Sequence, residues 1–152
     1  MPRVSRTRVI EAPRADVWSV VADPHHLPRW WPRALRVEDV RGDPGSRRTH
    51  WTLVLGTAQG RSVRADFRSI SAAAGERYVW QQLVEDSPFE RIIRSAEAGV
   101  ELADEGLGTA VTIYTDERLR GLSRLGSACR MRALSRAGRR VCRKQSRRFA
   151  RR

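Results

Sequence analysis

The middle of the chain is a succession of short extended runs, and this feature constrains the fold most. Apolar and polar residues alternate with a period of two over six runs, at 35–41, 47–55, 61–71, 76–84, 89–103 and 107–118. Turn-forming stretches such as Gly42-Asp43-Pro44-Gly45 and Asp86-Ser87-Pro88 separate them. The separations are too short for parallel crossovers, so the pattern predicts antiparallel hairpins.

The residues before these runs predict one more strand and two short helices. Residues 4–10 have the composition of a strand, and Pro13 suits the first turn of a helix that runs to Ala22. Asp23 is a candidate cap for a second short helix that has Pro24 at its first position and ends near Trp31.

The residues after Gly121 predict a long C-terminal helix. Its apolar stripe has spacings of three and four and consists of Leu122, Leu125, Cys129, Ala133 and Ala137. A sheet and a helix that each have one apolar face must bury those faces against each other. The sequence therefore predicts an α+β fold, with a seven-stranded curved antiparallel sheet wrapped around the long helix. A cavity for an apolar ligand is expected between the two.

The positive charge of the chain is confined to one end. The formal net charge is +13 over 152 residues, but residues 1–117 contain 16 basic and 17 acidic residues. Residues 118–152 contain 14 basic residues and no acidic ones. We therefore expect one ligand-binding domain over residues 1–138 and a basic tail or helix extension over residues 139–152. The tail suggests binding to nucleic acid or an anionic membrane, or else a solvated helix end.

Cysteine and histidine usage predicts neither a disulfide nor a metal site. Cys129 and Cys142 lie 13 residues apart in a predicted helix, or about 20 Å at a rise of about 1.5 Å per residue. His25, His26 and His50 have no metal-ligand spacing, and no cofactor motif is present. The first residues lack an apolar signal core, and no apolar run is long enough for a membrane span, so we expect a soluble cytoplasmic protein. The sequence does not determine the oligomeric state.

Several stretches resemble the START-like (SRPBCC) superfamily, and within it the polyketide cyclase/dehydrase branch. They are Val9-Ile10-Glu11-Ala12-Pro13, Asp16-Val17-Trp18, Asp23-Pro24, Trp30-Trp31-Pro32, Ser87-Pro88-Phe89-Glu90-Arg91, Gly108-Thr109-Ala110-Val111-Thr112 and Arg120-Gly121-Leu122. The resemblance covers residues 4–138 and implies a helix-grip fold with a deep ligand cavity. Residues 139–152 depart from the family pattern, since relatives usually end their long helix with mixed charge.

The resemblance also gives one candidate catalytic residue. Cyclases of this family place an arginine on a mid-sheet strand beside aromatic residues, and Arg68 occupies that position here. A cavity arginine would hold an enolate oxygen during an aldol ring closure. Strand alternation predicts the opposite, because Val63, Ala65 and Phe67 form the apolar face and leave Arg68 on the solvent face. Leu27 and Ala34 stand where the family has aromatic partners.

Because the aromatic partners are missing and alternation turns Arg68 toward solvent, the sequence favours binding over catalysis. The preferred hypothesis is that the protein binds a small hydrophobic, lipid- or polyketide-like molecule. A polyketide cyclase/dehydrase-type enzyme is the first alternative, and an accessory protein acting through its basic tail is the second. The predicted cavity lining is Trp51, Leu53, Phe67, Trp80, Val111, Ile113, Leu125 and Cys129.

Overall fold

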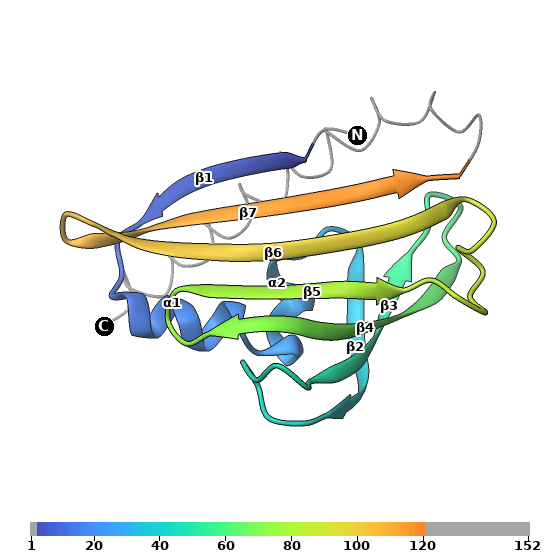
Figure 1. Cartoon of the computed structure of the whole chain (residues 1–152), viewed down its shortest axis with the longest axis horizontal. Coiled ribbons are helices and arrows are strands. Elements are labelled where there is room, and N and C mark those ends of the chain that lie inside the picture. Colours follow the sequence, from blue (N-terminus) through green and yellow to red (C-terminus); the bar gives the residue numbers. More distant parts are fainter. Residues whose placement is uncertain (1–2, 121–152) are drawn as a thin grey trace.

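The computed structural model describes residues 3–120, which form one antiparallel sheet with three short helical segments (Figure 1). The strands are β1 Val4–Ile10, β2 Ala34–Arg41, β3 His50–Gly56, β4 Ser62–Ala73, β5 Arg77–Leu83, β6 Ile93–Glu105 and β7 Gly108–Leu119. The helices are α1 Arg14–Val21, the 3-10 helix η1 Pro24–His26 and α2 Leu27–Trp30. The predicted long C-terminal helix and the tail lie outside the described residues.

The sheet has the order β1-β7-β6-β5-β4-β3-β2. Every neighbouring pair of strands is antiparallel. Strands β2 to β7 follow one another as a meander, and β1 closes onto β7 at the far edge. This is the curved seven-stranded antiparallel sheet that the sequence predicts (Figure 1). The predicted α+β class, the number of strands and the two short helices after β1 are confirmed.

The sheet has two chemically different faces, which we call inner and outer. Directly opposed residues of an antiparallel pair lie on the same face, so the face follows from the register. The inner face carries the residues that pack against α1 and α2, for example Trp51 opposite Phe67. On β4, the buried residues Ala65 and Phe67 alternate with the exposed outer residues Asp66 and Arg68. The apolar core therefore lies between the inner face and the two helices.

The turn from α1 into α2 is built as the sequence predicts. The Asp23 carboxylate accepts a hydrogen bond from the His25 backbone N–H at 3.0 Å, and Pro24 is the first residue of η1. Pro24 is fully buried, and α2 delivers the buried residues Leu27 and Trp30 to the core. This capped turn therefore fixes where α2 lies on the inner face.

Two strands begin later than the sequence pattern predicts. Residues 43–49 form a turn because the Thr49 hydroxyl donates to the Asp43 carbonyl, and the Ser69 hydroxyl donates to the Ser46 carbonyl at 2.6 Å. Strand β3 therefore begins at His50 rather than at residue 47. Residues 89–92 form a turn in which the Ile93 N–H donates to the Phe89 carbonyl, so β6 begins at Ile93 rather than at residue 89.

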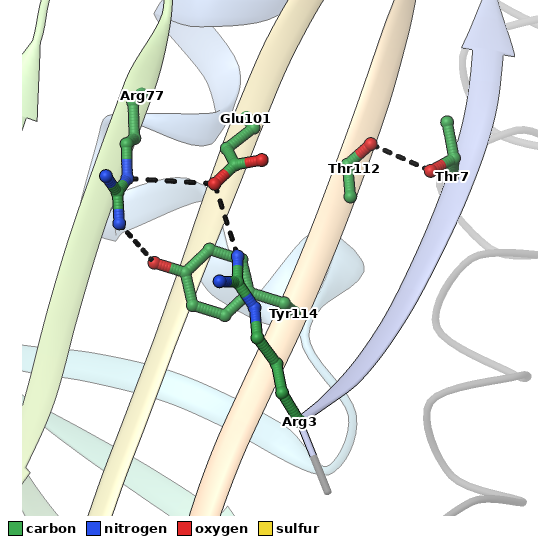
Figure 2. Close-up of polar contacts among 6 residues, drawn as sticks. All are labelled: Arg3, Thr7, Arg77, Glu101, Thr112 and Tyr114. Carbon is green, nitrogen blue, oxygen red and sulfur yellow. Dashed lines mark hydrogen bonds and ion pairs between the residues drawn. The ribbon is translucent and has the colours of Figure 1, made fainter.

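A polar network crosses the outer face from β1 to β5 (Figure 2). Glu101 on β6 lies 3.2 Å from Arg3 and 3.7 Å from Arg77. The Arg3 guanidinium covers the ring of Tyr114, and the Tyr114 hydroxyl accepts a hydrogen bond from Arg77. This hydrogen bond raises the pKa of Arg77 further above its ordinary value. The network ties the edge strand β1 to the middle of the sheet.

Candidate functional site

The inner face carries one continuous group of aromatic rings, which we call the inner aromatic cluster. Trp80 on β5 is its centre, with ring centroids 6.4 Å from Trp30, 5.7 Å from Trp31 and 6.3 Å from Trp51. Edge-on packing of this kind adds to the stability that burial of the rings already gives. All five tryptophans of the chain belong to the cluster. Its members are Trp18, Trp30, Trp31, Trp51, Phe67, Tyr78 and Trp80.

Beside the cluster lies a small recess between α1, α2 and the strands β1 and β7, which we call the β1–β7 recess. Its volume of about 10 Å³ is room for about one water molecule. A larger ligand would therefore use the inner face as one wall instead of being enclosed by these residues alone. The recess is lined by Ile10, Val17, Val20, Val21, Trp30, Val111 and Ile113.

The inner aromatic cluster contains polar atoms that the fold buries without a partner. The indole nitrogens Trp30 Nε1 and Trp51 Nε1 are buried and have no hydrogen-bond partner among residues 3–120. Trp30 and Trp51 are 3% and 2% exposed, so water does not solvate these side chains freely. Buried polar groups in proteins are nearly always paired, and an indole N–H can only donate. The two unpaired donors are therefore suited to acceptor atoms on a bound molecule.

Tyr78 contributes a third polar atom to the same region. Its hydroxyl is buried, with the hydroxyls of Thr49 and Ser69 nearby. Burial raises the pKa of Tyr78, and the nearby Thr49 and Ser69 hydroxyls only partly offset this effect. Tyr78 therefore stays protonated at neutral pH and offers a neutral hydroxyl. Its ring lies beside Trp51 and Trp80, over Val21, Pro24 and Leu27.

Arg68 lies on the outer face, away from the inner aromatic cluster. It follows the buried Phe67 on β4 and is exposed, as strand alternation predicts. Its Nε and Nη2 lie 2.7 and 2.6 Å from the Gln81 side-chain amide, whose oxygen accepts both hydrogen bonds. His50 is its neighbour on the other side, on β3. A shift of register between Ser69 and Ser71 comes after Arg68 and leaves its face unchanged.

The structure brings together six of the eight residues expected to line the cavity. Val111 and Ile113 line the β1–β7 recess, while Trp51 and Trp80 meet in the aromatic cluster. Leu53 is buried on the same face, and the Phe67 ring stacks on Trp51 with centroids 6.0 Å apart. Leu125 and Cys129 lie outside the described residues.

Sequence reasoning missed several contributors to this site. Tyr78 lies two residues before Trp80 on the same strand. Alternation therefore places both side chains on the same face, and it could have predicted Tyr78 as part of the site. Val17, Val20 and Val21 on α1 gave no such signal, because valines on a short helix are typical of any core. Their place against β7 depends on how α1 crosses the sheet.

Residues 3–120 contain neither a cluster of metal-ligating side chains nor a helix that could span a membrane. No three potential metal-ligating side chains, of His, Cys, Asp or Glu, gather in this part of the chain. None of its helices has the length and apolar character needed to cross a membrane.

Solved structures share this architecture. The major latex-like protein 151 of Panax ginseng has a TM-score of 0.75 at 12% identity, over 95% of this chain and 97% of its own. DR_A0006 of Deinococcus radiodurans has a TM-score of 0.66 at 21% identity, over 95% and 97% of the two chains. The di-domain ARO/CYC StfQ of the steffimycin biosynthetic pathway has a TM-score of 0.73 at 11% identity, over 94% of this chain and 49% of its own. At identities this low, the TM-scores establish a common fold.

Sequence comparison assigns the family. No curated protein sequence matches the chain significantly. A family model described as "Polyketide cyclase / dehydrase and lipid transport" matches residues 1–152, which is the whole chain. The START-like resemblance read from the sequence is thereby confirmed, and the chain belongs to the polyketide cyclase/dehydrase and lipid transport family.

Proposed function

We propose that the inner face binds a planar, largely apolar molecule that carries hydrogen-bond acceptors. The observation that carries this proposal is the pair of buried, unpartnered indole donors at Trp30 and Trp51. They lie in an aromatic cluster beside an apolar recess, the combination expected of a small-molecule site. Membership of a family named for polyketides and lipids supports the same class of ligand.

Binding is favoured over catalysis by the chemistry of the cluster. Tyr78 is its only titratable member, and its raised pKa keeps it protonated at neutral pH. General acid–base catalysis needs a group that gives or takes a proton near the working pH. The enzymatic alternative, a polyketide cyclase, would assign stabilisation of an enolate to Arg68. The exposed outer-face position of Arg68 gives that role no support.

The proposal is tested by titrating the protein with N-phenyl-1-naphthylamine, a neutral planar fluorophore. Val20 lines the β1–β7 recess, so Val20→Phe should obstruct it and weaken binding at least about fivefold, equivalent to about 1 kcal/mol of overpacking. Val9→Phe makes the same change at a position that is 49% exposed on the outer face, and should bind like the wild type. The proposal fails if the wild type shows no saturable binding, or if both variants bind equally well.

The basic C-terminal segment is the basis of a separate function hypothesis. Fourteen basic and no acidic residues in 118–152 would neutralise phosphates of nucleic acid or of an anionic membrane. Truncation after Gly138 removes eight of these fourteen bases and should then weaken binding to DNA or to anionic vesicles at low salt. Binding by the truncated chain equal to that of the full chain would exclude a role for residues 139–152.

A further inference from the structure

The edge strand β1 carries charge on the face where the rest of the sheet is apolar. In the register, Arg6 is opposite Ile113 and Arg8 is opposite Val111. Opposed residues in an antiparallel pair lie on the same face, with their Cα atoms about 4.5–5.5 Å apart. Ile113 and Val111 belong to the inner face and line the β1–β7 recess. Both arginines are therefore direct neighbours of recess residues.

The outer residues of β1 confirm this assignment. The Thr7 hydroxyl lies 2.8 Å from the hydroxyl of Thr112, on the outer face that also carries the polar network around Tyr114 (Figure 2). Alternation along the strand then places Arg6 and Arg8 on the opposite, inner side. Ile10, the next inner residue, is buried in the core.

Arg6 and Arg8 are exposed and lack an anionic partner. The ion pairs of residues 3–120 that involve arginine engage Arg3, Arg14, Arg36, Arg64 and Arg77. Arg6 and Arg8 take part in none of them. The remaining chain cannot supply a carboxylate side chain either, because the sequence has no Asp or Glu after Glu117. Two adjacent positive charges at an apolar surface are thus left without a counter-charge.

We propose that Arg6 and Arg8 bind the oxyanion head of an amphipathic ligand whose apolar body lies against the β1–β7 recess. Residues two apart on a strand are separated by about 7 Å, a span over which two guanidiniums can hold one carboxylate, sulfonate or phosphate. Guanidinium suits such heads because it donates several hydrogen bonds in one plane. This inference rests on the proposed function and narrows its ligand class to anionic amphiphiles.

The arginines have one competing explanation, which is protection of a free sheet edge. Strand β1 pairs only with β7, and inward-pointing charges on an edge strand discourage pairing with a second copy. This explanation predicts a change in oligomeric state when the charges are removed. The ligand proposal predicts a change in the affinity for anions, so the two explanations differ in what they alter.

The test compares two fluorophores with closely related aromatic skeletons. N-phenyl-1-naphthylamine is neutral, and 8-anilinonaphthalene-1-sulfonate adds a sulfonate. Replacing both arginines, in Arg6→Gln/Arg8→Gln, should weaken sulfonate binding at least about tenfold, as expected for loss of charge-assisted hydrogen bonds. Binding of the neutral probe should change less than about twofold, since its interactions are apolar. Added salt should weaken only the binding of the sulfonate.

A matched control separates a local effect from the overall positive charge. Arg64 and Arg68 also share one face of a single strand, four residues apart, but that face is the outer one. Arg64→Gln/Arg68→Gln lowers the net charge by the same amount and should leave both affinities unchanged. Equal loss of sulfonate binding in the two double variants would overturn the proposal.

Competition identifies the head group. 2-Naphthoate and 2-naphthyl phosphate should displace the sulfonate probe from the wild type better than neutral 2-naphthol. The anion with the higher affinity of the two identifies the preferred head group. Equal displacement by all three compounds would refute an anion site. A dimer formed by Arg6→Gln/Arg8→Gln, with an unchanged ratio of the two probe affinities, would assign the arginines to edge protection. Failure of the wild type to bind the neutral probe counts against the proposed function instead.

Discussion

Gly99 lies directly beneath the ring of Tyr114 on the outer face. A Cβ atom at residue 99 would come within 2.5 Å of Tyr114 Cζ, which is closer than real side chains approach. The Tyr114 side chain is 1% exposed because Arg3 covers the other side of its ring. The absence of a side chain at residue 99 is what allows a tyrosine to lie flat in the middle of this face.

Replacement of Gly99 by alanine should therefore destabilise the protein. The methyl group would displace the Tyr114 ring and its hydrogen bond from Arg77, at a cost of about 1–3 kcal/mol in the free energy of unfolding. Denaturant titration measures this cost. Gly56→Ala is the control, because a Cβ there meets Leu35 at an ordinary 3.6 Å. Equal stability of the two variants would contradict the steric account.

The carboxylate of Asp23 should make stability depend on acidic pH. Burial pushes the pKa of Asp23 upward, but hydrogen bonds from the His25 backbone and ring outweigh it, so the pKa lies below its ordinary 3.8. The stabilising contribution of the carboxylate is thus present above about pH 4 and lost as the pH falls through the folded-state pKa. Asp23→Ala should cost about 1 kcal/mol at neutral pH, the usual value of a helix cap.

The matched variant for this residue is Asp23→Asn, which keeps a capping oxygen and removes the charge. It should be more stable than Asp23→Ala at neutral pH, because asparagine also caps helices well. The stability difference between the wild type and Asp23→Asn should shrink as the pH falls below 4. A difference that stays constant from pH 7 to pH 3 would show that the charge of Asp23 contributes nothing to stability.

The two indole donors predict a preference for ligands that carry an acceptor. 2-Acetylnaphthalene and 2-isopropylnaphthalene have nearly the same shape, but only the first carries a carbonyl oxygen. Loss of a donor in Trp51→Phe should lower the ratio of their affinities about fivefold, which corresponds to one hydrogen bond of about 1 kcal/mol. Displacement of N-phenyl-1-naphthylamine measures both affinities.

The control for this prediction is Trp31→Phe, which changes a ring of the same cluster. The Trp31 indole nitrogen is not among the buried unpartnered atoms, so the affinity ratio should stay at the wild-type value. Trp30→Phe should behave like Trp51→Phe. A ratio that falls equally in all three variants would show that ring packing, and not hydrogen bonding, sets the preference.

Arg68→Ala should leave ligand binding unchanged. The side chain is exposed on the outer face and bonds to Gln81, so its loss should alter the affinity for N-phenyl-1-naphthylamine less than about twofold. Stability should change by no more than about 0.5 kcal/mol, as for most surface substitutions. A large loss of binding would mean that Arg68 contributes to the ligand site after all.

The order of the elements was readable from the sequence because their signals are local. Alternation identified β2 to β7, composition identified β1, and the Asp23-Pro24 pair located the cap of η1. The starts of β3 and β6 were misplaced because hydrogen bonds between distant residues, such as Ser69 to Ser46, hold those segments in turns. Such contacts have no counterpart in the pattern of one segment.

The site was only partly readable for a related reason. Alternation correctly separates Phe67 from Arg68, because one side of β4 is clearly apolar. Strand β1 offers no such contrast, since Arg6 and Arg8 occupy the side that the core would need. Their inner position emerges only from the pairing of β1 with β7, which joins segments about a hundred residues apart. The neighbours of the indole nitrogens likewise depend on how the helices cross the sheet.

The most direct measurement follows the five indole N–H signals of the protein by two-dimensional ¹H–¹⁵N NMR during titration with 2-acetylnaphthalene. Each tryptophan gives one side-chain signal, and single Trp→Phe variants assign them. Our account predicts that the Trp30 and Trp51 signals shift and saturate at the same ligand concentrations, because both free donors belong to the site that the ligand occupies. Saturable binding that leaves both signals unmoved, or no binding at all, would contradict a ligand site on the inner face.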